Sequence, residues 1–306
     1  MASGKGKTFA ALPGENIWFS EYHAASVKMS WRVEVLAVEQ SPYQRMVVMH
    51  NPDFGVFFTL DGFLQLTSRD EFIYHDMIVH PALAVNPDIR RVLIVGGGDG
   101  GTARETLRYP QLETVDMVEI DEMVPRLCRT YLPQTAAALD DPRLRLTIGD
   151  GLAFVRAAAD ASYDLILVDS TDPVGPGEGL FTREFYGECY RALTEKGILV
   201  NQHESAFYAG DLREMRRAHE KIAAVFPIAE VYGFNLPCYS SGYWYFGFAS
   251  KQLHPLRDQQ AARWEAFGLA TRYYNSRLHA AAFALPSYVR ARLDGSAEAE
   301  CGAAEE

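Results

Sequence analysis

The stretch Arg91-Val-Leu-Ile-Val-Gly-Gly-Gly-Asp-Gly-Gly101 decides the fold of this chain. It opens with an apolar run of strand length, continues into a glycine-rich turn and leads into a helical pattern. Gly96, Gly98 and Gly101 have the spacing of the turn in dinucleotide-binding folds, where the backbone turns tightly and approaches a ligand closely. A tight strand–helix turn without a ligand needs the same glycines. The stretch therefore predicts the first strand and helix of a parallel α/β sheet, with ligand binding as one use of the turn.

Apolar runs of strand length recur after this stretch and alternate with helical patterns. They span 115–120, 144–148, 163–168 and 197–200, and a helix over 182–193 separates the last two. A helix over 211–226 and strands near 228–232 and 243–248 follow. Strands that alternate with helices form parallel sheets with crossover helices. We therefore expect a Rossmann-like, doubly wound, mostly parallel α/β sheet over residues 69–293, whose first helix spans 69–83.

The residues before this domain have the pattern of a β structure. Trp31, Val33 and Val35 alternate with polar residues, and apolar runs at 46–49 and 56–60 follow. The turn sequences Asn-Pro-Asp and Asp-Gly separate the runs. Residues 17–68 are therefore expected to form a small N-terminal antiparallel β domain. The ends, residues 1–16 and 294–306, are rich in small or charged residues and are expected to be disordered tails.

Composition and charge restrict the partners and the compartment. The chain of 306 residues has a formal net charge of −11, which argues against nucleic acid because phosphate binding needs a basic surface. Its four cysteines are widely spaced without a Cys-x-x-Cys pair, which indicates a reducing compartment. The N-terminus lacks the apolar core of a signal peptide, and no apolar run has the length of a membrane span. We therefore expect a cytoplasmic protein that binds neither nucleic acid nor membrane.

Acidic residues follow successive strands of the predicted sheet. Glu119 and Asp150 end the second and third strands, where a carboxylate can accept hydrogen bonds from ribose hydroxyls or an adenine amine. Either residue could instead cap a helix. Asp169 ends the fourth strand, Asp172 follows it, and Glu204 follows the fifth strand. Because the carboxyl ends of parallel strands meet at one edge of a sheet, we expect a negative cleft suited to ammonium groups.

Asp99 separates the possible ligands of the glycine turn. A pyrophosphate or an amino-acid carboxylate would meet a like charge there, whereas a free ammonium would be attracted. The turn therefore favours an adenosine-bearing ligand with a cationic tail and no acid group, as in decarboxylated S-adenosylmethionine. In the alternative interpretation, Asp99 points away or caps the following helix. No histidine lies near Asp169 in the sequence, and its loop lacks the oxygen spacing of a calcium site, so no metal is expected.

Several stretches together resemble the spermidine synthase family of polyamine aminopropyltransferases, in order from residue 18 to about residue 293. They are Trp18-Phe-Ser-Glu21, Leu60-Asp-Gly62, Arg69-Asp-Glu-Phe-Ile-Tyr-His75, the glycine turn with Asp99, Glu119-Ile-Asp121, Gly149-Asp-Gly151, Asp169-Ser-Thr-Asp-Pro173, Gly175-Pro176, Arg272-Tyr-Tyr-Asn275 and His279-Ala-Ala-Ala-Phe-Ala-Leu-Pro286. The resemblance implies a fold of the class I S-adenosylmethionine-dependent transferase type. It also implies transfer of an aminopropyl group from decarboxylated S-adenosylmethionine to putrescine, which gives spermidine and methylthioadenosine.

The resemblance implies a role for each matching residue. Asp169 would be catalytic and accept a proton from the attacking amine, assisted by the Tyr74 hydroxyl. The residues that would hold the co-substrate are Gln44, Gly96, Gly98, Asp99, Glu119, Asp150, Gly151 and Pro176. The residues that would line the site of the diamine are Trp18, Gln65, His75, Asp172, Glu204 and Tyr239. Taken alone, His75 is interpreted as a satisfied, partly buried side chain and not as a metal ligand. Cys238 stands where the family more often has Thr, which leaves the diamine preference open.

The implied reaction needs no metal, prosthetic group or covalent intermediate. An amine is nucleophilic only when neutral, and an alkyl ammonium loses its proton at about pH 10. Asp169 must therefore accept a proton during or before the attack on the carbon beside the sulfonium. In-line attack then releases methylthioadenosine, with alignment and exclusion of water providing most of the rate.

Three other functions share parts of the pattern. A methyltransferase would share the fold and Glu119, but Asp99 would oppose the carboxylate of S-adenosylmethionine. A nicotinamide dehydrogenase would place a pyrophosphate against Asp99. A polyamine-binding module without catalysis is disfavoured because Tyr74 and Asp169 are both present. The acceptor stays open among putrescine, cadaverine, agmatine and spermidine, and the resemblance implies a homodimer or a homotetramer.

Overall fold

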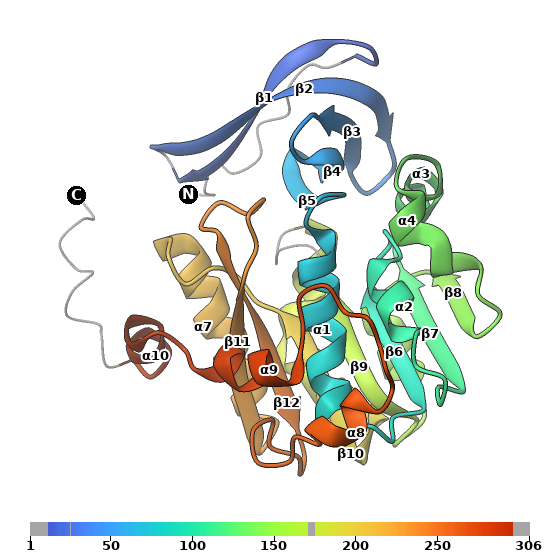
Figure 1. Ribbon diagram of the computed structural model, residues 1–306, viewed down its shortest axis with the longest axis vertical. Coiled ribbons are helices and arrows are strands. Elements are labelled where there is room, and N and C mark those ends of the chain that lie inside the picture. The colour runs from blue at the N-terminus through green and yellow to red at the C-terminus, as the bar shows by residue number, and fades with distance from the viewer. Residues whose placement is uncertain (1–11, 25, 171–174, 296–306) are drawn as a thin grey trace.

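The structure is a computed structural model that describes residues 12–24, 26–170 and 175–295. In these ranges, an antiparallel sheet of five strands lies above a mostly parallel sheet of seven strands, which is covered by helices (Figure 1). The expected terminal tails fall mainly on residues outside this description. No helix within the described ranges is both long enough and apolar enough to cross a bilayer.

The upper sheet contains its five strands in chain order. They are β1 (Asn16–Ala24), β2 (Val27–Gln40), β3 (Arg45–Asn51), β4 (Gly55–Leu60) and β5 (Phe63–Thr67). On β2, Trp31, Val33 and Val35 are buried and the residues between them are exposed, as their alternation predicts. Asp61 and Gly62 both have positive φ angles, 51° and 88°, which makes the tight β4–β5 hairpin. This sheet confirms the expected antiparallel unit, although β1 lies before the first strand that the pattern predicted.

The lower sheet has the order β11-β12-β10-β9-β6-β7-β8. Its strands are β6 (Arg91–Gly96), β7 (Thr114–Glu119), β8 (Leu144–Ile148), β9 (Tyr163–Asp169), β10 (Leu193–Gln202), β11 (Ile228–Asn235) and β12 (Tyr243–Ser250). The five strands from β10 to β8 are parallel, and β12 and β11 add an antiparallel edge. The doubly wound, mostly parallel sheet is thereby confirmed. The glycine turn leaves the middle of this sheet, where β6 lies between β9 and β7.

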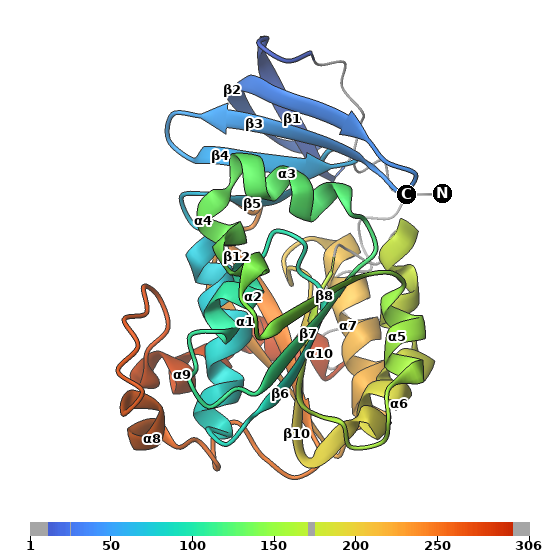
Figure 2. The same ribbon diagram turned by 90° about the vertical axis from the view of Figure 1, so that its right-hand side faces the viewer.

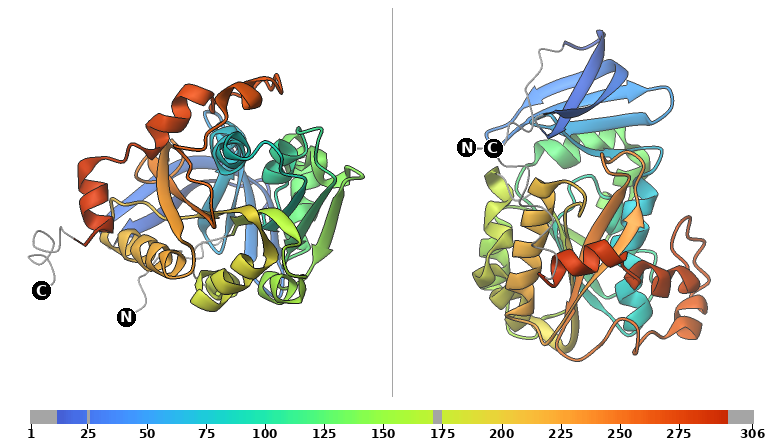
Figure 3. Two further views of the ribbon diagram at one scale, coloured as in Figure 1. Left: turned by 90° about the horizontal axis from the view of Figure 1, so that it is seen from below. Right: turned by 90° about the vertical axis from the view of Figure 1, so that its left-hand side faces the viewer.

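Helices cover both faces of the lower sheet, as the view from below shows (Figure 3, left). The longer helices are α1 (Glu71–Val85), α3 (Met123–Tyr131), α5 (Gly151–Ala157), α6 (Arg183–Ala192), α7 (Ala209–Ala223), α9 (Ser276–Phe283) and α10 (Ser287–Leu293), and the short ones are α2 (Gly101–Thr106), α4 (Pro133–Ala136), α8 (Ala261–Glu265) and the 3-10 turns η1 (Ala137–Asp140) and η2 (Gly175–Phe181). Side chains of β6 alternate between the two layers. Ile94 packs in the core with α1 and α2, and Val95 packs in the core with α5, α6 and α7. The sheet is therefore buried on both faces, which explains its near-continuous apolar strands.

Asp121 joins the two sheets through hydrogen bonds of its side chain. Asp121 follows β7, and its Oδ2 accepts hydrogen bonds from Ser41 Oγ at 2.7 Å and from Gln44 Nε2 at 3.1 Å in the β2–β3 turn. Figure 2 shows the upper sheet directly above α3 and α4 at this side of the molecule. The upper sheet is therefore held over the edge of the parallel sheet at which β7 ends.

The C-terminal motif with Arg272 packs on the outer side of α1. Asp76 Oδ2 accepts hydrogen bonds from the backbone N–H groups of Arg272, Tyr273 and Tyr274, at 3.1, 2.7 and 3.1 Å. Because Asp76 directly follows His75 on α1, the helix connects this C-terminal segment to the residues that face the sheet edge.

Candidate active site

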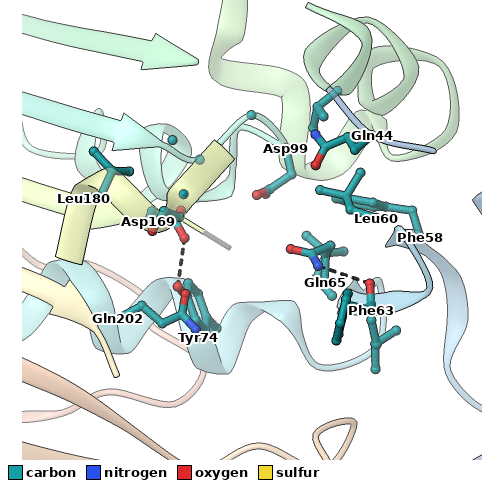
Figure 4. Close-up of a pocket in the computed structure, with 18 of the residues that line it drawn as sticks. Gln44, Phe58, Leu60, Phe63, Gln65, Tyr74, Asp99, Asp169, Leu180 and Gln202 are labelled. Atoms are coloured by element: carbon teal, nitrogen blue, oxygen red, sulfur yellow. Dashed lines mark hydrogen bonds between the residues drawn. The ribbon is translucent and has the colours of Figure 1, made fainter. Parts of the chain in front are cut away.

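A cavity of about 170 Å³ lies between the two sheets, at the carboxyl edge of the parallel sheet (Figure 4). Residues at the ends of β6, β7, β9 and β10 line it from below, including Gly96, Glu119, Asp169 and Gln202. Apolar residues of β4 and β5 line it from above, among them Phe58, Leu60, Phe63, Leu64 and Leu66. The cavity therefore occupies the place where open α/β sheets bind their ligands.

The lining of the cavity is strongly acidic. Seven lining residues carry a carboxylate: Glu21, Asp99, Glu119, Asp150, Asp169, Glu204 and Asp211. The other titratable lining residues are His23, His75, Tyr22, Tyr74 and Tyr239, and among the described residues that line the cavity there is no Lys or Arg. Such a surface attracts cations and repels phosphates and free carboxylates.

Asp169 is held by hydroxyl groups on both of its oxygens. Oδ1 accepts a hydrogen bond from the Tyr74 hydroxyl at 2.8 Å (Figure 4). Oδ2 accepts one from Thr102 Oγ1 at 2.6 Å. Burial, and after it the charge of Asp99, raise the pKa of Asp169 above its usual value, while His75 and the two hydroxyl groups act in the opposite direction. Burial and the charge of Asp169 raise the pKa of Tyr74 well above its usual value, so its hydroxyl stays a donor.

The glycine turn brings β6 against the end of β9. Gly96 has φ +85°, and a Cβ at this position would lie 2.1 Å from the carbonyl oxygen of Asp169. A Cβ at Gly98 would lie 2.8 Å from Glu119 Oε2. Any larger residue at either position would push these two carboxylate residues away from the turn. The glycines are thus needed for the approach of the turn to the neighbouring acidic residues.

Asp99 uses one oxygen within the protein while its side chain points into the cavity (Figure 4). Its Oδ1 accepts a hydrogen bond from the N–H of Gly101 at 2.8 Å, which is the helix-capping use considered above, and it also lies 3.3 Å from His75 Nε2. The two interpretations of Asp99 therefore apply together: one oxygen caps the start of α2, and the carboxylate still faces the ligand space.

His75 is fully buried and lies between two carboxylates. Its Nδ1 is 2.6 Å from Glu71 Oε2, and its Nε2 faces Asp99. Burial alone would lower the pKa of His75, but the charges and hydrogen bonds of Asp99 and Glu71 outweigh it and raise the pKa to about 10. The ring is therefore an imidazolium at neutral pH.

His75, Asp99 and Asp169 also have the arrangement that a metal ion would need, with ligand atoms within 4.8 Å of one another. The hydrogen bonds already described use both oxygens of Asp169, and a protonated His75 offers no lone pair to a metal. An organic cation, which needs only acceptors, would be held by the two carboxylates of this group, Asp99 and Asp169.

The residues expected to bind the nucleoside form another part of the cavity wall. Glu119 is buried, its Oε1 accepts a hydrogen bond from the N–H of Asp121 at 2.9 Å, and burial raises its pKa to about 7. Asp150 caps α5, since its Oδ1 accepts hydrogen bonds from the N–H groups of Leu152 at 2.8 Å and Ala153 at 3.4 Å, and it also lines the cavity. Gln44 and Gly151 complete this wall. The structure thus brings together all the expected nucleoside residues that it describes.

The expected acceptor residues are gathered only in part. Glu204, Tyr239 and Gln65 line the cavity together, and the Tyr239 hydroxyl donates a hydrogen bond to the carbonyl oxygen of Gln65 at 2.6 Å. Asp172 lies outside the described residues, as does the side chain of Pro176. The role of each residue toward a ligand stays a prediction.

Trp18 does not line the cavity, contrary to its expected place beside the diamine. Its side chain is 69% exposed, while Phe19 and Glu21 of the same strand are buried. Successive side chains of a strand point to opposite faces, so Glu21 faces the cavity and Trp18 faces away. Cys238 is also absent from the lining, since it is buried and its N–H donates to Asp70 Oδ2 at 2.9 Å.

Among the residues of the site that were not expected, four add to its acidic groups or bind them. Glu21 and Asp211 line the cavity, Thr102 binds Asp169, and Glu71 binds His75. Glu21 and Glu71 lie inside stretches that carry the family resemblance, so their position was a usable signal. Thr102 and Asp211 belong to no such stretch, and only the three-dimensional structure shows their contacts.

Comparison with known proteins agrees with this geometry. The family model described as spermine/spermidine synthase domain matches residues 71–259, and the model described as spermidine synthase tetramerisation domain matches residues 17–68. The polyamine aminopropyltransferase of Clostridium acetobutylicum is 57% identical over 281 residues, which cover 91% of this chain and 98% of the relative. The polyamine aminopropyltransferase of Alkaliphilus oremlandii is 53% identical over 283 residues, covering 92% and 99%.

Solved structures give the same result at the level of the fold. A crystal structure of spermidine synthase in complex with the transition state analogue AdoDATO superposes with a TM-score of 0.88 at 39% identity, covering 94% of this chain and 98% of that one. The crystal structure of spermidine synthase from Thermotoga maritima has a TM-score of 0.87 at 38% identity, covering 94% and 97%.

Proposed function

The chain belongs to the spermine/spermidine synthase family of polyamine aminopropyltransferases, and from this premise we propose that it makes spermidine. The reaction transfers the aminopropyl group of decarboxylated S-adenosylmethionine to putrescine and releases methylthioadenosine. The observation that carries this proposal is the acidic lining of the cavity, which has seven carboxylates and, within the described ranges, no Lys or Arg. Both substrates are cations at neutral pH, and such a lining attracts both of them.

The nucleoside part of the co-substrate is proposed to lie along the wall formed by Glu119, Asp150 and Gln44. Glu119, once ionised, would accept hydrogen bonds from the ribose hydroxyls, because only its Oε1 is bound to the backbone of Asp121. Asp150 Oδ1 caps α5, which leaves its second oxygen for the adenine amine. No prosthetic group or metal enters this reaction.

The aminopropyl group is proposed to lie between Asp99 and Asp169. One oxygen of each residue lies within 4.8 Å of the other, so one ammonium fits between both. The carboxylate of intact S-adenosylmethionine would add a negative charge to this group, and like charges in a buried site repel strongly. The pair therefore favours the decarboxylated co-substrate, and the arrangement argues against a methyltransferase.

Proton removal is proposed to be the task of Asp169. The amine nitrogen attacks the carbon beside the sulfonium, the carbon–sulfur bond breaks, and its electron pair stays on the sulfur of methylthioadenosine. The proton released by the amine passes to Asp169, whose raised pKa makes it a stronger base than an ordinary carboxylate. Tyr74 and Thr102 fix the direction of its two oxygens, so the acceptor orbital is aligned before the reaction.

The far end of the acceptor is proposed to lie near a second group of acids, Glu204, Glu21 and Asp211. All three are buried and line the cavity, and Tyr239 and Gln65 line it as well. A diamine with a cation at each end matches two separate acidic groups. Putrescine is the proposed acceptor, and cadaverine, agmatine and spermidine are the alternatives.

The assembly is proposed to be a homodimer or a homotetramer built through residues 17–68. The family model that matches these residues is described as a tetramerisation domain. β1 is an edge strand of the upper sheet and exposes Trp18, and an edge strand with an exposed aromatic residue is suited to pairing with another chain.

A single incubation tests the function. The protein is mixed with decarboxylated S-adenosylmethionine and a panel of amines, and the products are identified by mass. We expect spermidine from putrescine with an equal amount of methylthioadenosine. A methylated product from intact S-adenosylmethionine, together with stronger thermal stabilisation by S-adenosylhomocysteine than by methylthioadenosine, would overturn the proposal.

A further inference from the structure

A row of alternating charges lies behind the cavity and runs from α2 to the glycine turn. Arg104 NH1 and NH2 donate to Glu71 Oε1 and Oε2 at 3.1 and 2.9 Å. Glu71 Oε2 contacts His75 Nδ1 at 2.6 Å, and His75 Nε2 lies 3.3 Å from Asp99 Oδ1. Glu71 and His75 are only 3% and 1% exposed, so water does not screen these contacts.

This row of contacts requires that the ring of His75 is protonated on both nitrogens. A neutral imidazole has one N–H, so it can donate to one carboxylate only and turns a lone pair toward the other. His75 has a carboxylate on each nitrogen, and both contacts are favourable only for the imidazolium. Other groups near the ring are Tyr74 on the same helix and Asp169 on β9, and neither of them is a cation.

Gly101 leaves the space that the His75 ring occupies. A Cβ at Gly101, the first residue of α2, would lie 2.1 Å from His75 Cε1 and 2.4 Å from both ring nitrogens. The glycine thus provides the space in which the ring reaches Asp99, which shows that the contact is built into the packing of α1 against α2.

The positive charge of His75 acts on the ionisation of Asp169 in front of it. Asp99 and Asp169 have oxygens within 4.8 Å in a buried site, and two carboxylates so close tend to share a proton. An Asp169 that holds a proton cannot accept another from the attacking amine. The charge of His75 acts against the effect of Asp99 and favours the ionised form of Asp169.

We propose that Glu71 and Arg104 are positioning residues that keep His75 a permanent imidazolium, whose charge favours the ionised form of Asp169 beside Asp99. The inference rests on the proposed aminopropyl transfer and adds the groups that set its protonation state. Arg104 acts through Glu71, Glu71 acts through His75, and neither Arg104 nor Glu71 lines the cavity.

The first test follows the ring nitrogens of His75 by nitrogen-15 NMR in the unliganded protein, with the signal assigned from His75→Gln. In the unchanged protein we expect both nitrogens to stay protonated up to pH 9, and in Glu71→Gln we expect the ring to lose its proton at a lower pH. A His75 that titrates like a free histidine in the unchanged protein would overturn the inference, whether or not the variant folds. This result does not depend on any substrate.

The second test compares the pH dependence of kcat/KM. Above the pH at which the ring loses its proton in Glu71→Gln, the ratio of wild-type to variant kcat/KM should rise about tenfold per pH unit, because the active protonation state is depleted at that rate. Glu105→Gln is the matched control, since Glu105 Oε1 accepts from Arg104 Nε at 2.9 Å but does not contact His75. For Glu105→Gln, the ratio of wild-type to variant kcat/KM should stay constant with pH.

A ratio for Glu71→Gln that is equally constant would show a merely structural role and contradict the inference. If the unchanged protein transfers no aminopropyl group to any amine, the proposed function fails instead, and the NMR titration still decides the state of His75.

Discussion

At the scale of single residues, the chemistry of the site depends on what surrounds each carboxylate. Asp169 is half-buried, bound by two hydroxyl groups and close to a second acid, while Asp150 is exposed and caps a helix. Their positions at the ends of strands were predictable from the sequence. Their environments were not, because Thr102 reaches Asp169 from a neighbouring helix and no pattern along the chain indicates that contact.

Asp169→Asn should abolish transfer and leave nucleoside binding intact. An amide has nearly the shape of the carboxylate but accepts no proton, and a general base contributes about 10²–10⁴-fold to a rate. We expect kcat to fall by that factor while the affinity for methylthioadenosine, measured by calorimetry, stays within about twofold. Thr102→Ser is the matched control, since it keeps the hydroxyl that binds Asp169, and its kcat should stay close to wild type. Turnover of Asp169→Asn at the wild-type rate would contradict the assigned role.

Glu119 should make both stability and nucleoside affinity depend on pH. Its pKa rises from 4.5 to about 7, so between these values the folded protein holds more protons than the unfolded chain. The free energy of unfolding therefore decreases as the pH rises through this window, by up to about 3 kcal/mol. Ribose hydroxyls need the ionised carboxylate as acceptor, so the affinity for methylthioadenosine should increase over the same window.

Glu119→Gln isolates this effect, because the amide does not titrate. Urea unfolding at pH 5 and pH 8 should show a smaller loss of stability for the variant than for the unchanged protein, and its weak nucleoside binding should not vary with pH. Equal pH dependence of unfolding in both proteins would show that Glu119 is ionised in the same way in the folded and the unfolded state.

At the scale of elements, α1 is used on both of its sides. Tyr74 and His75 face the site, and Asp76 holds the C-terminal segment through three backbone N–H groups. The sequence predicted the helix but not its sides, since 14 of its 15 residues are buried and it therefore has no polar stripe. β1 was missed because its one charged inward residue, Glu21, breaks the alternation of apolar and polar residues. By contrast, the glycine turn could be predicted, because tight backbone approach leaves glycine as the only residue that fits.

Gly101→Ala should disturb the contact between α2 and α1. The added Cβ meets the His75 ring at 2.1 Å, and overpacking of this kind costs about 1–3 kcal/mol. We expect lower stability in urea unfolding and a lower kcat/KM, because the ring moves away from Asp99. Gly187→Ala on α6 is the control, since its Cβ meets nothing within 4 Å and should stabilise the helix by about 0.5–1 kcal/mol. A Gly101→Ala variant with unchanged stability and rate would show that the ring adapts.

Asp76→Ala should lower stability far more than the loss of a surface acid. Three N–H groups would lose a charged acceptor at once, which costs about 3 kcal/mol or more. Glu113→Ala removes a surface ion pair with Arg90 and should cost less than about 1 kcal/mol. Thermal and urea unfolding of both variants make the comparison. Equal losses would mean that the C-terminal segment is held mainly by its apolar contacts.

At the scale of the whole molecule, the cavity exists because two different sheets face each other. The Rossmann-like part provides acids at strand ends, and the upper sheet provides an apolar roof from β4 and β5. The succession of most strands along the chain, the two sheets and the family could be predicted from the sequence, since turn residues and periodicity are local. The docking of the sheets through Asp121 could not be predicted from the sequence, because Ser41 and Gln44 lie about 80 residues away along the chain.

Trp18→Glu should weaken the assembly without unfolding the chain. The indole is 69% exposed on an edge strand, so a charge there costs little in the monomer but opposes pairing of β1 with another subunit. Analytical ultracentrifugation should show a smaller species than for the unchanged protein. Tyr43→Glu, 45% exposed in the β2–β3 turn, is the control and should leave the mass unchanged. An unaltered mass of Trp18→Glu would place the subunit contact elsewhere.

With seven carboxylates and no Lys or Arg among its described residues, the lining is a surface at which different cations compete for the same acids. Under the proposed function, a triamine product carries three positive centres and the diamine substrate carries two, so the product would be held more strongly by these acids. Such a product would dissociate slowly from the cavity. The rate at which the product leaves the cavity would then set the upper limit of kcat.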